Sequence, residues 1–112
     1  MTTLSTLQQE VRNFRDARDW KQFHSPKNLS MSIAIEAAEL MEHFQWLTVE
    51  EATQLPQTDS AAKEAIAEEL ADVLIYCLSL ADTLNYNVAE IILGKLAKNE
   101  AKYPAEKYKG RF

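Results

Sequence analysis

Apolar residues recur three or four positions apart through most of the chain, which is the spacing of one face of a helix. Ser5 followed by Gln8 fits a capping box at the start of the first such segment, and Asn87 followed by Glu90 marks the start of the last. We therefore expect an all-α fold, a bundle of four main helices. The pattern places these helices over about residues 5–18, 29–46, 60–84 and 87–102.

The stretches between and after these segments are predicted to be irregular. Residues 48–60 are acidic and polar and contain Pro56, so we expect a loop with at most one short turn over residues 49–54. Residues 105–112 are polar and basic and have no helical period. We expect a single domain over residues 1–104, followed by a basic tail that is either mobile or docked on a partner subunit.

The connection between the first two helices contains Trp20, Phe23 and His24, which is more aromatic character than a simple connector needs. Pro26 suits the first turn of the helix that follows. Aromatic faces can stack on a nucleobase, at roughly 1 to 3 kcal/mol per base. Alternatively, Trp20 and Phe23 close one end of the bundle, and composition favours this interpretation.

Two pairs of carboxylates interrupt the apolar faces of the second and third helices. Glu36 and Glu39 lie three residues apart, as do Glu69 and Asp72, so each pair shares one helix face. The residues that flank each pair are apolar, which predicts that the four carboxylates face the interior. Charges at core positions are costly unless they are paired or bind a metal, so we expect a cation between them.

The ligand set indicates which metal fits. Mg²⁺ takes oxygen ligands and is usually shared between carboxylates and substrate phosphates. Di-iron carboxylate bundles use Glu-x-x-His motifs, but neither of the two histidines follows a glutamate by three positions. Zinc, which favours Cys and His, fits less well. His43 follows Glu39 by four positions, and we expect it to form hydrogen bonds around the site without ligating the metal.

Composition agrees with a small helical domain that gains from self-association. The chain has 112 residues with only 2 glycines and 3 prolines. A core of this size is modest, so oligomerisation would help. The third helix is apolar nearly all round, so we expect it to be central, with the single Cys77 buried. Lacking a long apolar run, a secretory signal and a cysteine pair, the sequence predicts a cytoplasmic protein with no membrane span.

Charge is unevenly distributed along the chain. The net charge of −5 argues against a nucleic-acid polymer as partner, but the last helix and the tail are basic. Folding this segment onto the acidic helices would place a phosphate site beside a metal site. The basic residues of this segment are Lys95, Lys98, Lys102, Lys107, Lys109 and Arg111, against the acids Glu100 and Glu106.

The two acidic motifs and the strings around them resemble the MazG-like, all-α nucleoside triphosphate pyrophosphohydrolases, and most of all the dCTP pyrophosphatase branch. The resemblance covers about residues 20–104, in the expected order and spacing. The strings that carry it are FHSPKNL (23–29), EAAELMEHFQW (36–46), EELADVLIYCLSLA (68–81) and KLAKNEAKYP (95–104).

The resemblance implies a function and a cofactor. Glu36, Glu39, Glu69 and Asp72 would ligate Mg²⁺, with Mn²⁺ as a substitute. The chain would hydrolyse a nucleoside triphosphate to a monophosphate and pyrophosphate, with dCTP or a modified dCTP as the first expectation. This reaction would remove non-canonical or surplus deoxynucleotides from the nucleotide pool. Of the four acids, we expect Glu39 to take the proton of the water. The family branch also implies a homodimer or homotetramer.

The nucleotide pocket is assigned mainly by the same resemblance, which implies roles there for His24, Trp46, Asn99 and Tyr103. The lysines Lys95, Lys98 and Lys102 share one face of the last helix and could hold the β and γ phosphates. Lysines late in a helix also favour the negative end of its dipole without any phosphate. An aromatic residue such as Trp46 at a helix end is more often a core or interface residue.

A second class of function is compatible with the same residues. A small acidic bundle can be a non-catalytic interaction module, or it can bind nucleotides without hydrolysing them. The interaction module predicts no metal dependence, whereas the enzyme predicts that turnover requires Mg²⁺. The sequence leaves open the base preference, the number of metal ions, the order of the oligomer and the role of the tail.

Overall fold

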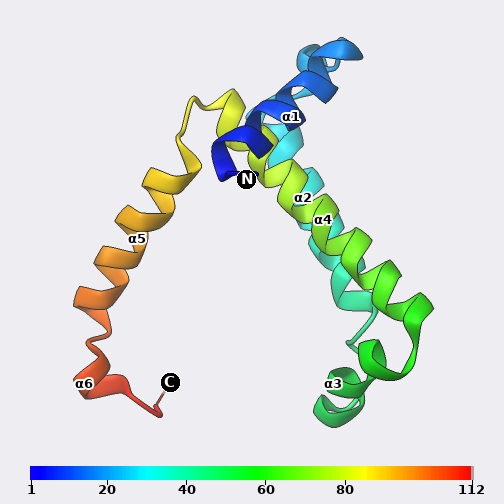
Figure 1. Ribbon diagram of the computed structural model, residues 1–112, viewed down its shortest axis with the longest axis vertical. Helices are drawn as coiled ribbons and strands as arrows, with labels where there is room; N and C mark the ends of the chain where they lie inside the picture. The colour runs from blue at the N-terminus through cyan, green and yellow to red at the C-terminus, as the bar shows by residue number, and fades with distance from the viewer. Residues whose placement is uncertain (112) are drawn as a thin grey trace.

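The structure, a computed structural model, describes residues 1–111, in which helices are joined by turns and there are no strands (Figure 1). The all-α fold predicted from the sequence is therefore confirmed. No helix in the described part of the chain is long and apolar enough to cross a membrane. The helices are α1 (Leu4–Ala17), the 3-10 helix η1 (Lys21–Phe23), α2 (Pro26–Glu42), α3 (Val49–Thr58), α4 (Ser60–Thr83), α5 (Val88–Lys102) and α6 (Ala105–Tyr108).

Local capping sets where the first helices begin. Thr3, not Ser5, caps α1: its Oγ1 accepts from the Thr6 amide at 3.2 Å, and its own amide donates to Thr6 Oγ1 at 2.8 Å. The predicted capping box at Ser5 was wrong by two residues, because Thr3 and Thr6 form the box instead. Pro26 is in the first turn of α2, as predicted.

The predicted loop over residues 48–60 is mostly the helix α3, so that prediction was wrong. Thr48 and Glu51 form a capping box, with Oε1 of Glu51 accepting from the Thr48 amide at 2.9 Å. Pro56 lies inside the helix without ending it. Because the box satisfies amides at the helix start, the segment becomes helical despite the proline. The basic tail likewise contains a short helix, α6.

The small core lies where α1, α2 and α4 meet. α2 and α4 pack side by side along their lengths, α1 crosses the later part of α4, and α3 lies against α4 (Figure 1). Leu29 is 1% exposed and Ala81 is also buried, which places the densest packing near the start of α2 and the end of α4. α4 is therefore the central helix, as expected.

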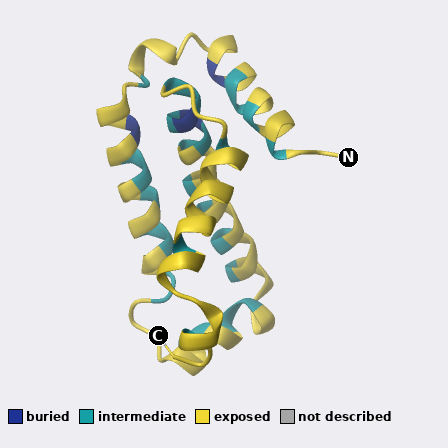
Figure 2. Cartoon of the chain, turned by 90° about the vertical axis from the view of Figure 1, so that its left-hand side faces the viewer, coloured by how far each residue is buried: buried dark blue, intermediate teal, exposed yellow. Residues whose placement is uncertain are grey.

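Helix α5 leaves this group of helices and runs away from it (Figure 1). Its main contact is with α1. The radius of gyration is 17.1 Å, whereas a compact domain of this length has a value of about 13 Å. Figure 2 shows α5 almost wholly exposed, and its apolar residue Leu93 is 67% accessible. Within one chain the described helices thus do not close into a four-helix bundle.

Other apolar residues are also exposed because the helices of one chain do not close into a bundle. Leu74 on α4 is exposed, and so is Cys77, which the sequence predicted to be buried. That prediction was wrong because α2 covers only one side of α4. The second helix also ends at Glu42 and not near Trp46, so Trp46 lies in the following turn with 86% of its surface accessible.

Candidate metal centre

The packing of α2 on α4 brings three of the four predicted acids together. Glu36 comes from α2, and Glu69 and Asp72 come from α4. Each offers one carboxylate oxygen, and these three oxygens lie within 4.8 Å of one another. Because Glu69 and Asp72 are three residues apart, one turn of α4 presents both to the same point on α2.

The fourth acid, Glu39, lies one turn further along α2 and interacts with the cluster. Burial, then the hydrogen bond and charge of Glu39, raises the pKa of Glu36 to about 7, and a hydrogen bond with Glu69 and the charge of Asp72 add to this effect. Burial also raises the pKa of Glu69, with further contributions from Glu39 and Asp72, although a hydrogen bond with Glu36 opposes the shift. The raised pKa values of Glu36 and Glu69 thus reflect burial together with the neighbouring carboxylates.

The acids have no cationic neighbour within the described chain. The ion pairs found among residues 1–111 join Arg12 and Arg15 to Asp16 and Asp82, which are outside the cluster. One oxygen of Glu36 and one of Glu69 are buried without a hydrogen-bond partner among these residues. A set of oxygen donors with buried, unsatisfied atoms fits a hard divalent cation such as Mg²⁺.

A cavity of about 210 Å³ opens beside this cluster, between α1 and α4. Asp72, Trp20 and His24 are among the residues that line it. The Trp20 ring also packs edge-on against Phe14, with ring centroids 5.7 Å apart. Phe23, in contrast, is exposed and therefore does not cover the end of the helix bundle within one chain. The predicted pocket residue His24 and Trp20 therefore line the same cavity as Asp72, one acid of the cluster.

The remaining predicted pocket residues do not reach the acids within one chain. Trp46 is exposed in the turn after α2. The others lie on α5 or just after it, and Figure 1 shows that helix standing apart from α2 and α4. A single chain thus presents the metal site and the predicted phosphate site separately. The residues on the α5 side are Lys95, Lys98, Asn99, Lys102 and Tyr103.

Sequence reasoning missed two residues near this site, Arg15 and Asp82. Arg15 lines the cavity and is buried, and Asp82 is its partner on α4. A signal was present: Arg15 follows Val11 by four positions and so continues the apolar stripe of α1, while Asp82 interrupts an apolar run. A charge on each of two buried faces predicts an ion pair between them.

An all-helical fold with acid pairs on adjacent helices defines a class of helical protein with a candidate metal site, and comparison with known proteins identifies the family. The model of the MazG-like family matches residues 31–111, so the chain belongs to the MazG-like family. A crystal structure of a pyrophosphatase from Archaeoglobus fulgidus is 44% identical, with a TM-score of 0.80, and the match covers 93% of this chain and 94% of that one.

Curated relatives agree with this family. The dCTP pyrophosphatase 1 of Bos taurus is 37% identical over 109 residues, which is 96% of this chain. The human protein of the same name is 39% identical over 104 residues, or 92% of this chain. The chain spans 63% and 60% of the length of these two relatives.

Proposed function

We propose that this chain is a Mg²⁺-dependent nucleoside triphosphate pyrophosphohydrolase. It would cleave a deoxynucleoside triphosphate, dCTP or a modified dCTP in the first instance, to a monophosphate and pyrophosphate. The observation that carries the proposal is the convergence of three carboxylate oxygens within 4.8 Å of one another, with no cationic side chain paired to them in the described chain. Relatives named as pyrophosphatases support the reaction.

Three of the acids would bind the metal, and the fourth would accept a proton. Glu36, Glu69 and Asp72 would hold Mg²⁺, or Mn²⁺ in its place. When bound, the metal lowers the pKa of a bound water and offsets phosphate charge. Glu39 is not one of the three converging residues but interacts with Glu36 and Glu69, so we assign it to accept the proton of the attacking water.

The cavity beside the acids would receive the nucleoside. Trp20 offers an aromatic face and His24 a ring nitrogen at the wall of this cavity, and Asp72 lies at its acidic side. A nucleotide bound with its phosphates at the acids could therefore place its base between α1 and α4. Stacking on such a face is worth roughly 1 to 3 kcal/mol.

A second copy of the chain would complete the site. Exposed apolar residues on α5 and the large radius of gyration support a homodimer or homotetramer. Packing of α5 from one copy against α2 and α4 of another would bury these residues and form a four-helix bundle across two chains. It would also carry Lys95, Lys98 and Asn99 towards the partner's acids, where they could hold the β and γ phosphates.

The reaction can be tested with a panel of canonical and cytosine-modified dNTPs in the presence of Mg²⁺, Mn²⁺ or EDTA. We expect a monophosphate and pyrophosphate, formed only with the metal. Glu39→Gln should abolish turnover with the fold intact, whereas Glu42→Gln, an exposed acid on the same helix, should not. A diphosphate product, or no turnover of any nucleotide, would overturn the proposal and leave a nucleotide-binding or interaction module.

A further inference from the structure

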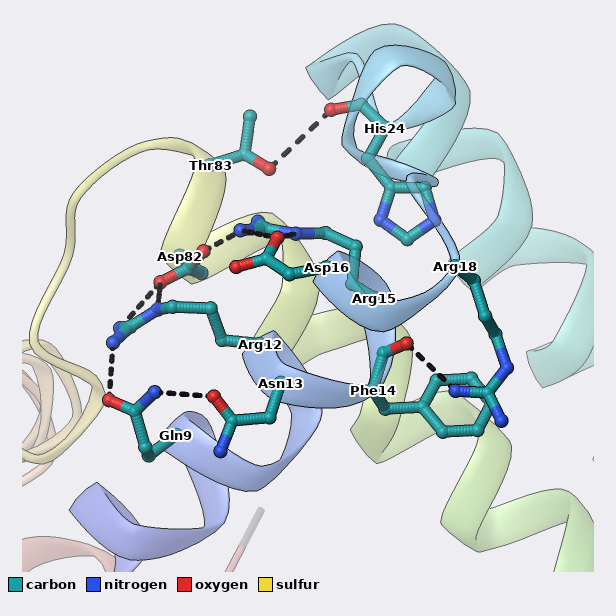
Figure 3. Close-up of polar contacts among 10 residues, drawn as sticks. All are labelled: Gln9, Arg12, Asn13, Phe14, Arg15, Asp16, Arg18, His24, Asp82 and Thr83. Atoms are coloured by element: carbon teal, nitrogen blue, oxygen red, sulfur yellow. Dashed lines mark hydrogen bonds and ion pairs between the residues drawn. The ribbon is translucent and has the colours of Figure 1, made fainter.

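Arg15 is the one charged residue that is buried among residues 1–111, with 5% of its surface accessible. Its guanidinium is held on two sides (Figure 3). Nη1 lies 2.6 Å from Oδ2 of Asp82, and Nη2 lies 2.8 Å from Oδ1 of Asp16, to which Nε also donates at 2.9 Å. All three nitrogens of the fork are thus engaged, which fixes the side chain in one orientation.

The turn that contains Trp20 and His24 is tied to this ion pair at both ends. The Trp20 amide donates to the carbonyl oxygen of Arg15 at 3.1 Å. At the other end, the hydroxyl of Thr83, the neighbour of Asp82, lies 3.5 Å from the carbonyl oxygen of His24 (Figure 3). The backbone of the turn that carries these two rings is therefore held at one end by the Arg15 carbonyl and at the other by the hydroxyl of the residue next to Asp82.

Arg15 and His24 also lie together between two cavities. Both line the cavity of about 210 Å³ that reaches Asp72, and both line a more polar cavity of about 530 Å³. The His24 Nδ1 atom is buried and has no hydrogen-bond partner among the described residues. Burial, then the charge of Arg15, lowers the pKa of His24. The titratable or charged groups that line these cavities with His24 are Arg12, Arg15, Asp16, Lys21, Asp72, Tyr76 and Asp82.

We propose that Arg15 is a positioning residue for the nucleoside cavity: fixed by Asp16 and Asp82, it holds the turn that carries Trp20 and His24 so that both rings face the base. This inference rests on the proposed function for its substrate. The side chain of Arg15 pairs with Asp16 and Asp82, and it forms no ion pair with the acids of the candidate metal site among the described residues. Its loss should therefore weaken nucleotide binding and leave the chemical step at the acids largely unchanged.

The test uses two variants and a matched control in the full chain. The double variant Arg15→Met with Asp82→Leu removes both charges, so that no buried carboxylate is left unpaired. Asp82→Asn removes only the charge of Asp82, so it weakens one of the two contacts of the Arg15 guanidinium, and it is used if the double variant does not fold. The control is Arg12→Met: Arg12 also pairs with Asp82, at 2.6 Å, but it does not line the smaller cavity.

We expect the double variant to raise KM by about 10- to 100-fold while kcat changes by no more than about 2-fold. Asp82→Asn should raise KM in the same direction, and Arg12→Met should leave it within about 2-fold of the unaltered chain. If kcat falls with KM unchanged, or if Arg12→Met raises KM as much as the double variant, Arg15 is not a positioning residue. The second result would instead indicate that any loss of the α1–α4 ion pairs has this effect.

A readout without substrate separates this inference from the proposed function. The chain contains only 2 histidines and 2 tryptophans, so the His24 ring and the Trp20 indole can be followed individually by NMR. We expect both sets of resonances to move in the double variant and to stay in place in Arg12→Met. Unmoved resonances would overturn the positioning role even if the enzyme is active. Moved resonances would support it even if no nucleotide is turned over.

Discussion

Arg15 and Asp82 are 67 positions apart in the sequence, yet Nη1 of the arginine and Oδ2 of the aspartate are 2.6 Å apart. Arg12 contacts the other oxygen of the same carboxylate at 2.6 Å. This arrangement joins α1 to α4 next to the buried residue Ala81. In a chain with so few buried apolar residues, the pair is a large part of what holds α1 in place.

Replacing Asp82 with asparagine should lower the free energy of unfolding by about 2 to 3 kcal/mol at pH 7, because a buried arginine loses its charged partner. Burial alone would raise the pKa of Asp82, but hydrogen bonds from Arg12 and Arg15 hold it below its usual value. The stabilisation is thus complete above the unfolded pKa of about 3.9 and is lost as the pH falls through the lower folded value. Urea unfolding of both chains at pH 7 and pH 3 measures the free-energy difference and its dependence on pH.

The difference between Asp82→Asn and the unaltered chain should therefore be smaller at pH 3 than at pH 7, because below about 3.9 the aspartate of the unfolded chain takes up a proton more readily than the folded one does. Asp16→Asn is the control, since Asp16 binds the same arginine but is 53% exposed on its side chain. We expect it to cost less than about 1 kcal/mol. An equal loss for the two variants, or a difference independent of pH, would contradict the role given to Asp82.

Mg²⁺ should stabilise the chain without any nucleotide, because four repelling carboxylates gain a counter-ion. At a tenfold excess over the dissociation constant, the gain is about 1.4 kcal/mol. Glu36→Gln removes one of the repelling charges, so this variant should be more stable than the unaltered chain in EDTA and should respond little to Mg²⁺. Thermal unfolding with and without the metal tests this, with Glu42→Gln as the control. A response to Mg²⁺ that survives Glu36→Gln would place the metal elsewhere.

Much of the fold could be predicted because the information is local. Helical spacing placed α4 and α5 correctly, and Pro26 marked the start of α2. The acid pairs could be recognised because three-residue spacing on an apolar face has few structural explanations. Helix α3 was missed because Pro56 was given more weight than the Thr48 and Glu51 capping box, which satisfies the first amides of the helix.

The rest depended on contacts that spacing does not reveal. Burial of Arg15 makes sense only with Asp82 at the far end of another helix. Cys77 was predicted to be buried because α4 is apolar on all sides, but whether each side is covered depends on which other helices pack against it. The place of α5 depends on the turn around Asn85, which has a φ of 58° and directs the helix away from α4.

The apolar face of α5 should hold copies of the chain together. Leu93→Glu puts a charge at a residue that is 67% exposed in one chain but would be buried between copies. We expect sedimentation equilibrium to give a multiple of 12.8 kDa for the unaltered chain and a monomer for this variant. Val49→Glu, at an exposed apolar residue in the first turn of α3, is the control and should leave the oligomer intact. A monomeric unaltered chain would contradict this prediction.

If α5 serves the acids of the partner, two defective chains should complement each other. Glu36→Gln damages the metal site on α2, and Lys98→Met damages the predicted phosphate site on α5. In a mixed dimer, one site then combines intact α2 and α4 from the Lys98→Met chain with intact α5 from the Glu36→Gln chain. Unfolding and refolding an equal mixture should restore about a quarter of the unaltered activity, because half of the dimers are mixed and each has one intact site. If each α5 instead served its own chain, every site would carry a defect and the mixture would gain no activity.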